Sequence, residues 1–281
     1  MKVSNLTIVV FTCSLLAHQE AFTQALNGFF QGKGKIAIAA STTREKYDEF
    51  YFGDKKTSIK ETDLDKIVTR SINLYVAYGL SNKTDLIINV PYIITNARQL
   101  TDNKEVGERN FQNGSVTIQR KLIEKIDSAG TLTVAGGVGF NTPLSNYKTN
   151  LIYSIGNQST QISPLALVQY TLRNGLFANV QTGYSFRTNK VPDAIVSAAK
   201  IGYAGRLFYL EGWINNQTST GGIDIGQAGF TPERFPETKV NTTNIGASVF
   251  MAGVTLGAGK RLSGRNAGLP TFYTVGLAVT F

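Results

Sequence analysis

Apolar and polar residues alternate one by one through most of the chain after residue 33. Between Ser71 and Leu80, every second residue is apolar and most of the residues between them are small or polar. The apolar set consists of Ile72, Leu74, Val76, Tyr78 and Leu80. Successive side chains of a β-strand point to opposite faces, so this pattern predicts a strand with one fully apolar face.

The same alternation, strong or weak, recurs in about twelve segments. They are 34–42, 71–80, 85–94, 115–124, 131–141, 162–172, 176–187, 194–203, 207–216, 244–251, 254–263 and 271–281. Their lengths are close to the roughly 9–11 residues that a tilted strand needs to cross a bilayer. No segment after the N-terminus has an apolar run long enough for a spanning helix. If the chain enters a membrane, a closed barrel is the structure it can form there.

The connections between the segments are alternately short and mostly longer. The short ones are 81–84, 125–130, 173–175, 204–206 and 252–253. The others are 43–65, 95–114, 142–161, 188–193, 217–243 and 264–270. Short turns at one end, long loops at the other and an even strand count are typical of an outer-membrane barrel with antiparallel, up-and-down strands. A soluble β-sandwich also shows alternating strands, so the strand pattern alone leaves it open.

The placement of aromatic residues favours the barrel. One set falls on the apolar faces near the short turns: Tyr78, Tyr170, Tyr203, Phe208 and Phe281. A second set falls on the apolar faces near the long loops: Tyr92, Phe140, Tyr184, Phe186 and Tyr273. Two rings of aromatics on either side of an aliphatic band match the two interfaces of a bilayer, whereas a sandwich buries its aromatics between sheets.

The first 25 residues resemble a secretory signal peptide. Met1 and Lys2 give a positive start, residues 6–17 are mostly apolar, and Thr23 to Ala25 offer small residues for cleavage. A buried N-terminal helix is the competing interpretation. We therefore expect a cleaved signal at 1–25, a periplasmic segment at 26–33 and a barrel at 34–281 in the outer membrane of a Gram-negative bacterium.

The composition excludes several classes of site. The chain has one Cys and one His, Cys13 and His18, and both lie within the predicted signal. A mature chain would therefore lack thiolate and imidazole metal ligands, disulfides and His-dependent catalysis. We expect no cofactor and no enzymatic activity. The net charge of +9 forms no basic stripe on a helix or sheet, so we expect no nucleic-acid partner. It is compatible with outer-membrane lipid and lipopolysaccharide as partners.

Few ionisable residues face the predicted lumen. Lys200 and Glu211 lie at matched depth on neighbouring strands, and Asp85 and Lys121 are placed similarly on another strand pair. Opposite charges on adjacent strands stabilise a sheet, and the same pairs would also form a polar constriction on a solute path. Both interpretations stay open. One charged residue does not fit the pattern, because Arg120 falls on an apolar face.

Other lumen candidates lie on the remaining strands. Arg187 and Arg261 fall near the long-loop mouth, where they would favour anions or remain solvated at the rim. Inward aromatics would either fill the lumen or form an apolar track, and they are Tyr75, Tyr209, Trp213, Phe250 and Phe272. A barrel of this size lies between small filled barrels and wide porins. We expect a narrow or gated passage, partly closed by residues 26–32 or by an inward loop.

Two motifs resemble those of known membrane proteins. Gly276, Val279 and the terminal Phe281 resemble the C-terminal signal by which the barrel assembly machinery recognises outer-membrane barrels. Residues 47–51 (YDEFY), 78–86 (YGLSNKTDL) and 90–92 (VPY) resemble the phenol-degradation (MetA-pathway) outer-membrane family. The resemblance is best over residues 34–140, and it implies a barrel that transports small, often hydrophobic molecules.

Three functions follow from this reading of the sequence. The first is an outer-membrane channel or transporter for passive or gated passage of a small-molecule solute, and the second is a structural or adhesive barrel that acts through its long loops. The third is an outer-membrane enzyme, in which acid–base chemistry would fall to carboxylates or lysine because a mature chain would have no histidine.

Overall fold

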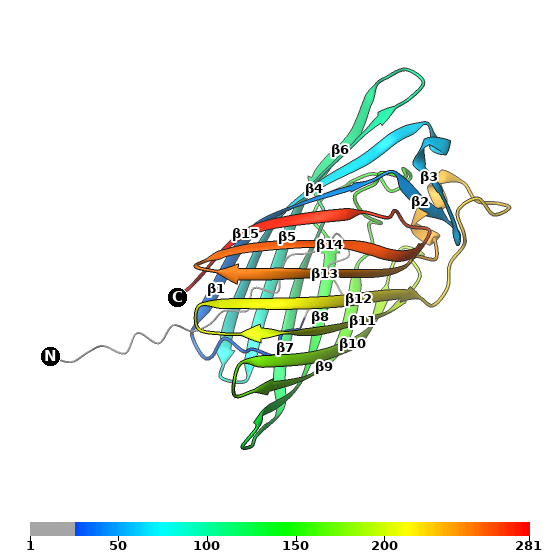
Figure 1. Cartoon of the computed structure of the whole chain (residues 1–281). Coiled ribbons are helices and arrows are strands. Elements are labelled where there is room, and N and C mark those ends of the chain that lie inside the picture. Colours follow the sequence, from blue (N-terminus) through cyan, green and yellow to red (C-terminus); the bar gives the residue numbers. More distant parts are fainter. Residues whose placement is uncertain (1–25) are drawn as a thin grey trace.

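The computed structural model describes residues 26–281 and shows a closed antiparallel β-barrel (Figure 1). Twelve strands form its wall. They are β1 (Ile36–Tyr47), β4 (Leu64–Ser81), β5 (Thr84–Gln99), β7 (Asn113–Ile126), β8 (Gly130–Pro143), β9 (Gln161–Leu172), β10 (Leu176–Arg187), β11 (Ala194–Ala204), β12 (Phe208–Ser219), β13 (Asn241–Met251), β14 (Val254–Arg265) and β15 (Thr271–Thr280). The predicted fold class and strand number are confirmed.

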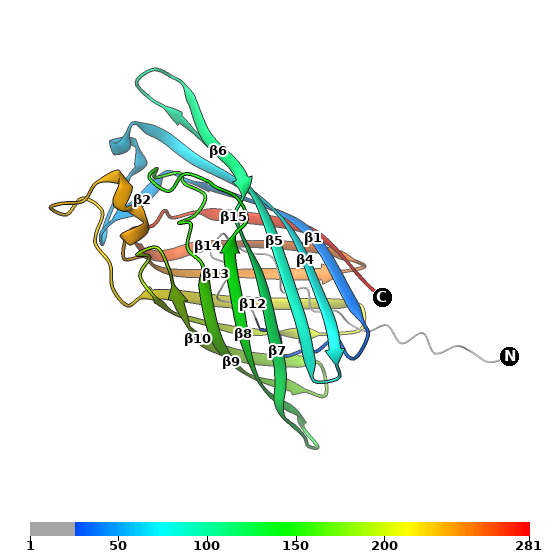
Figure 2. The same cartoon turned by 180° about the vertical axis from the view of Figure 1, so that it is seen from behind.

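Five further elements lie outside the wall. Strands β2 (Glu49–Phe52) and β3 (Lys55–Ser58) form a small hairpin. Strand β6 (Glu105–Phe111) pairs with residues 92–98 of β5, the part of that strand nearest the long loops. Two 3₁₀ helices, η1 (Ile59–Thr62) and η2 (Pro232–Glu237), lie in the long loops. Figure 2 shows the β5–β6 hairpin standing clear of the barrel at the long-loop end.

Each wall strand pairs with its neighbours in the chain, and the ring closes between β15 and β1. The Ile36 amide donates to the Phe281 carbonyl (3.1 Å), and the Phe281 amide donates to the Ile36 carbonyl (2.9 Å). The C-terminal motif therefore lies at the closing seam, with Val279 and Phe281 exposed and Gly276 on the inner face. Closure leaves no unpaired strand edge along the wall.

The two faces of the wall suit two different surroundings. Apolar side chains at alternate positions point outward and stay exposed, as Leu74 (49%) and Val180 (60%) illustrate. The predicted aromatic rings are also on the outside, with Phe208, Phe140 and Tyr273 all exposed. The inner face carries buried Ser, Thr, Asn and Gln. An apolar outer surface of this extent is stable in a bilayer and not in water.

Several strands are longer than the alternation predicts. β4 has 18 residues instead of ten, and β1 continues to Tyr47 into the segment expected to be a loop. Beyond the apolar band, outward positions become charged, as at Arg44 and Arg70, so the apolar alternation ends there. Backbone pairing needs no apolar face, and the strands therefore continue past the membrane.

Arg120 is exposed and lies opposite Thr84, at the short-turn end of β5. This position brings it to the interface, where a long arginine side chain keeps its charge in water. No helix within residues 26–281 is long and apolar enough to cross a bilayer. The predicted signal peptide lies outside the described residues.

Candidate functional site

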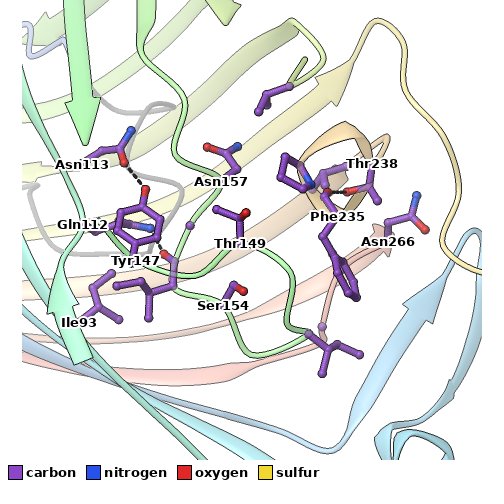
Figure 3. Close-up of a pocket in the computed structure, with 18 of the residues that line it drawn as sticks. Ile93, Gln112, Asn113, Tyr147, Thr149, Ser154, Asn157, Phe235, Thr238 and Asn266 are labelled. Atoms are coloured by element: carbon purple, nitrogen blue, oxygen red, sulfur yellow. Dashed lines mark hydrogen bonds between the residues drawn. The ribbon is translucent and has the colours of Figure 1, made fainter. Parts of the chain in front are cut away.

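The bore of the barrel has two different halves. Toward the long loops it holds a cavity of about 270 Å³ (Figure 3). Toward the short turns it contains inward side chains and residues 26–32, which enter it before β1 begins. These two halves contain the candidate site residues.

Residues 26–32 are held in the bore mainly by their backbone amides. The Leu26 amide donates to Gln181 Oε1 (3.3 Å), and the Asn27 amide donates to Gln119 Oε1 (2.8 Å). The Gln31 amide donates to the Asp85 carboxylate (3.2 Å). These acceptors lie on three different strands, β10, β7 and β5. The segment joins no wall strand by a ladder of backbone pairs, so it lies within the barrel without forming part of its wall.

Apolar contacts hold the same segment. Leu26 is buried with Leu165, Leu167 and Val196, and Phe30 packs against this cluster. The Phe29 ring meets the Phe177 ring edge to face, with centroids 5.3 Å apart. The segment is therefore held by apolar contacts as well as by hydrogen bonds, and it fills space that water would otherwise occupy.

Gly79 explains part of the motif at 78–86. A Cβ atom at Gly79 would lie 1.9 Å from the Gly32 carbonyl oxygen, so the backbone of the N-terminal segment would have to shift. The amide of Gly34 also donates to the Gly79 carbonyl (2.8 Å). A glycine here lets the N-terminal segment run close against β4. Its function is to permit this close approach.

Lys200 and Glu211 form a buried ion pair in the bore. Lys200 Nζ lies 3.3 Å from Glu211 Oε2, and their side chains are 3% and 2% exposed. The Tyr209 hydroxyl donates to Glu211 Oε2 (2.6 Å), and the Ser248 hydroxyl donates to Oε1 (3.1 Å). The structure thus brings together two residues that the sequence placed at matched depth. Neither lines the cavity, so we interpret them as a stabilising pair of the filled half.

The inward aromatics are buried side chains of the bore. Tyr209 stacks on Phe177 (centroids 5.5 Å apart), and Trp213 stacks on Phe272 (6.0 Å). All four are at most 6% exposed. Tyr75 is 5% exposed and packs in a cluster with the partly buried Phe250. This arrangement favours the interpretation that these residues fill the lumen over the interpretation that they form an apolar track for a solute.

Asp85 and Lys121 do not pair with each other. Asp85 accepts from Gln119 Nε2 (3.1 Å) and from the Gln31 amide. Lys121 contacts the Glu124 carboxylate, and its Nζ lies 5.2 Å from the centre of the Phe30 ring. Both residues therefore touch the N-terminal segment, which sequence patterns alone could not place beside them.

The cavity is lined by neutral polar side chains and, in similar measure, by apolar and aromatic ones. Amides from several strands face it, and they include Asn73, Asn89, Asn113, Asn141, Gln161 and Gln217. Arg187 and Arg261 also line it, at the long-loop mouth where the sequence placed them. Arg187 Nη2 donates to Gln217 Oε1 (2.7 Å), and Arg261 Nε donates to Asn244 Oδ1 (2.9 Å). The two guanidinium groups are held within the lining and not at a freely solvated rim.

Long loops roof the cavity. Tyr147, in the loop after β8, is buried beside Ile93 and Ile155, and its hydroxyl donates to Asn113 Oδ1 (Figure 3). Burial raises the pKa of Tyr147 to about 12, so the ring stays neutral at any physiological pH. Phe235 and Thr238, from η2 and the residue that ends it, close the other side.

The roof residues were missed by sequence reasoning. Phe50 and Ile59, from the connection between β1 and β4, share one buried cluster with Ile225 from the loop between β12 and β13. Ile152 and Phe235 pack against this cluster. A usable signal was present, because apolar residues recur in loops that would be expected to be solvated. Only the fold shows that they meet above the bore.

One network anchors the loop between β12 and β13 to the end of β14. Arg265 makes two hydrogen bonds with the Asp224 carboxylate, from Nε (2.8 Å) and Nη2 (2.5 Å). Asn266 Nδ2 donates to the Lys239 carbonyl (2.9 Å), and its Oδ1 accepts from the Ile225 amide (3.0 Å). This network holds part of the roof over the cavity.

The Asp224–Arg265 pair predicts a pH dependence of the roof. The bonds from Arg265 hold the pKa of the Asp224 carboxyl below its usual range. A lowered folded-state pKa means that the stabilisation is present above the ordinary aspartate pKa of about 3.9 and is lost as pH falls through the lowered value. We expect Asp224→Asn to speed amide hydrogen exchange in residues 220–240 roughly tenfold at pH 7. The wild type should lose this protection of residues 220–240 only below about pH 4, where the Asp224 carboxylate becomes protonated.

Hydrogen exchange followed by mass spectrometry measures this effect. Asp102→Asn serves as the matched control, because Asp102 is exposed in the β5–β6 turn and its carboxylate, among residues 26–281, accepts only from the nearby Lys104 amide. Equal exchange in both variants would show that the pair does not hold the loop.

Comparisons with known proteins agree with this architecture. No family model matches the sequence, and no curated protein matches it. The crystal structure of the COG4313 outer membrane channel from Pseudomonas putida F1 superposes with a TM-score of 0.67 at 13% identity, over 89% of this chain and 96% of that chain. The KdgM porin in complex with disordered oligogalacturonate gives a TM-score of 0.49 at 10% identity, over 87% of this chain and 99% of that one.

The fold is that of an outer-membrane β-barrel. At this identity the likeness establishes the architecture, so the chemistry of the bore must be argued from the residues of this chain. Within residues 26–281, no three His, Cys, Asp or Glu side chains come together in a way that could hold a metal ion.

Proposed function

We propose that this protein is an outer-membrane channel that passes small molecules through a gated bore. One observation carries the proposal. The bore contains a cavity of about 270 Å³ with a mixed polar and apolar lining, and the half toward the short turns is occupied in part by a short segment that does not belong to the wall. The interior of a small barrel of about eight strands is filled by its own inward side chains, whereas this bore keeps an open cavity. A segment held by a few side-chain acceptors can leave without breaking the sheet.

The lining indicates the class of solute. Amide groups such as Asn73 and Gln161 both donate and accept hydrogen bonds, and the rings of Tyr147 and Phe235 add flat apolar surface. Arg187 and Arg261 add positive charge, and Glu45 adds one negative charge in the same lining. A small hydroxylated solute with one flat face, such as a monosaccharide or a hydroxylated aromatic, fits these groups.

The resemblance at residues 47–51, 78–86 and 90–92 supports a finer assignment. We propose that the chain is a divergent relative of the phenol-degradation (MetA-pathway) outer-membrane family. We also propose that its function is not enzymatic, since residues 26–281 contain no His and no Cys. Recognition of Gly276, Val279 and Phe281 by the barrel assembly machinery is likewise part of the proposal.

Liposome swelling tests the channel function. Proteoliposomes should swell measurably in glycerol and in a pentose and should not swell in a trisaccharide, because the cavity admits only small solutes. Protein-free liposomes and liposomes with heat-denatured protein are the controls. Absence of swelling with every solute, both for the wild type and for a variant lacking residues 26–32, would favour the structural or adhesive alternative.

A further inference from the structure

Charged residues are distributed unevenly around the wall. In strands β8 to β13 the charged residues are Arg187, Lys200 and Glu211, and all three face the bore. The part of the wall from β14 through β15 and β1 to β5, together with the adjoining strand β6, carries outward cations near the long loops. We name five of them the basic patch: Arg44, Lys46, Arg70, Arg109 and Lys260. All five side chains are exposed.

The strand register brings the basic patch together. Arg44 of β1 lies directly opposite Arg70 of β4. Arg70 and Arg109 lie on either side of Ile94, and Lys46 and Lys260 lie on either side of Thr271. Adjacent strands are about 4.8 Å apart, so neighbouring cations of the patch lie within reach of one ligand. Figure 1 shows this part of the wall, in which β14, β15, β1 and β4 follow one another in this order.

The basic patch has no internal counter-charge. Among the described residues, none of its five side chains forms an ion pair. The cations farther out on the same strands differ, because Arg98 and Lys66 both lie 3.4 Å from the Asp65 carboxylate. Like charges directly opposite each other destabilise a sheet. The facing Arg44 and Arg70 thus carry a cost that nothing within residues 26–281 offsets.

The basic patch lies at the level of the outer interface. Arg44 is the register partner of Tyr273, an exposed member of the long-loop aromatic ring. Tyr92, another member of that ring, is two residues from Ile94 in β5. Aromatic rings of this kind lie among lipid headgroups, and arginine and lysine side chains extend from there toward phosphate.

We infer that the basic patch binds the phosphate groups of an outer-leaflet glycolipid, the lipid A part of lipopolysaccharide. Arginine guanidinium groups bind phosphate oxygens in pairs, and a phosphate between Arg44 and Arg70 relieves their repulsion. The inference rests on the outer-membrane location and not on the channel function, because every residue of the patch lies outside the bore.

Binding of fluorescent bisphosphorylated lipid A to the detergent-solubilised full chain tests the inference. We expect the variant Arg44→Gln/Lys46→Gln/Arg70→Gln to bind at least about tenfold more weakly, since each surface cation contributes roughly fivefold to binding an anionic lipid. The matched control is Arg120→Gln/Lys125→Gln/Arg206→Gln, which removes three exposed cations at the short-turn end. Its affinity should stay within about twofold of the wild type.

Competitors distinguish a phosphate site from charge alone. Unlabelled lipid A should displace the probe, whereas dephosphorylated lipid A and phosphatidylglycerol should not displace it at the same concentration. Unchanged affinity of the patch variant, an equal loss in the control, or equal displacement by phosphatidylglycerol would each overturn the inference. Both variants should retain the heat-dependent shift in gel mobility that reports a folded barrel, because the substituted side chains form no hydrogen bond or ion pair within residues 26–281. Solute permeation should also be unchanged, which separates this test from that of the channel function.

Discussion

Deletion of residues 26–32 should raise the single-channel conductance several-fold. These residues occupy the short-turn half of the bore, and their removal would join the cavity to the periplasmic opening. The wall should survive, because none of its strands pairs with the segment along a backbone ladder. Planar-bilayer recording of purified protein measures the effect, and liposome swelling in glycerol should accelerate in parallel.

A second variant distinguishes loss of a blocking segment from damage to the barrel by the deletion. Phe29→Ala/Phe30→Ala keeps the amide bonds to Gln181, Gln119 and Asp85 and removes the two rings that pack in the bore. We expect it to increase the frequency of brief openings and to leave the fully open conductance below that of the deletion. This intermediate result would show that the rings help to hold the segment in place.

The control for the deletion shortens the chain outside the bore. Removing residues 101–104 trims the turn between β5 and β6, which projects from the barrel (Figure 2). Its conductance should equal that of the wild type. If the deletion of 26–32 folds and conducts like the wild type, the buried ion pair and stacked rings must close the bore, and the segment is not its gate.

The wall of the barrel could be predicted because its two faces meet lipid and the bore, and the alternation of apolar and polar residues follows from this difference. At Ile72 to Leu80 the apolar side chains must face lipid and their neighbours must face the bore, so the sequence itself shows the strand. Lys200 and Glu211 could be paired by the same logic, since the turn at 204–206 fixes their relative depth. The register needs only local information.

The contents of the bore could not be predicted in this way. Leu26 bonds to Gln181 across 155 positions in the chain, and Gln31 bonds to Asp85 across 54. These contacts use backbone amides and single side chains, which leave no periodic pattern. Lys121 was assigned to Asp85 by depth alone. In the structure, Asp85 accepts from the Gln31 amide and Lys121 lies over the Phe30 ring, so each has a partner in the N-terminal segment.

The second large effect should come from the buried ion pair. Lys200→Met leaves the Glu211 carboxylate buried without its cation, and we expect the free energy of unfolding to fall by about 3–5 kcal/mol. The side chains of both partners are at most 3% exposed, so water cannot replace the lost charge. Glu211 would retain hydrogen bonds from Tyr209 and Ser248, which places the effect toward the lower end of this range.

Trp213 makes the measurement direct. It is the only tryptophan of the chain, it is 6% exposed, and it faces Lys200 in the register between β11 and β12. Its fluorescence in a guanidinium titration of detergent-folded protein should report opening of the wall beside the pair. Lys56→Met is the matched control, because Lys56 and Glu49 form an exposed pair in the β2–β3 hairpin. It should leave the titration midpoint unchanged.

A double variant then tests whether the pair is stabilising or only tolerated. Lys200→Met/Glu211→Gln removes both charges and keeps an amide, whose oxygen accepts from one of the Tyr209 and Ser248 hydroxyls while its NH2 group donates to the other. Its unfolding free energy should recover most of the loss caused by Lys200→Met, because the main cost of that variant is an unpaired buried charge and not a lost attraction. If the double variant is as unstable as the single one, the attraction between Lys200 and Glu211 itself holds β11 to β12 from within the bore.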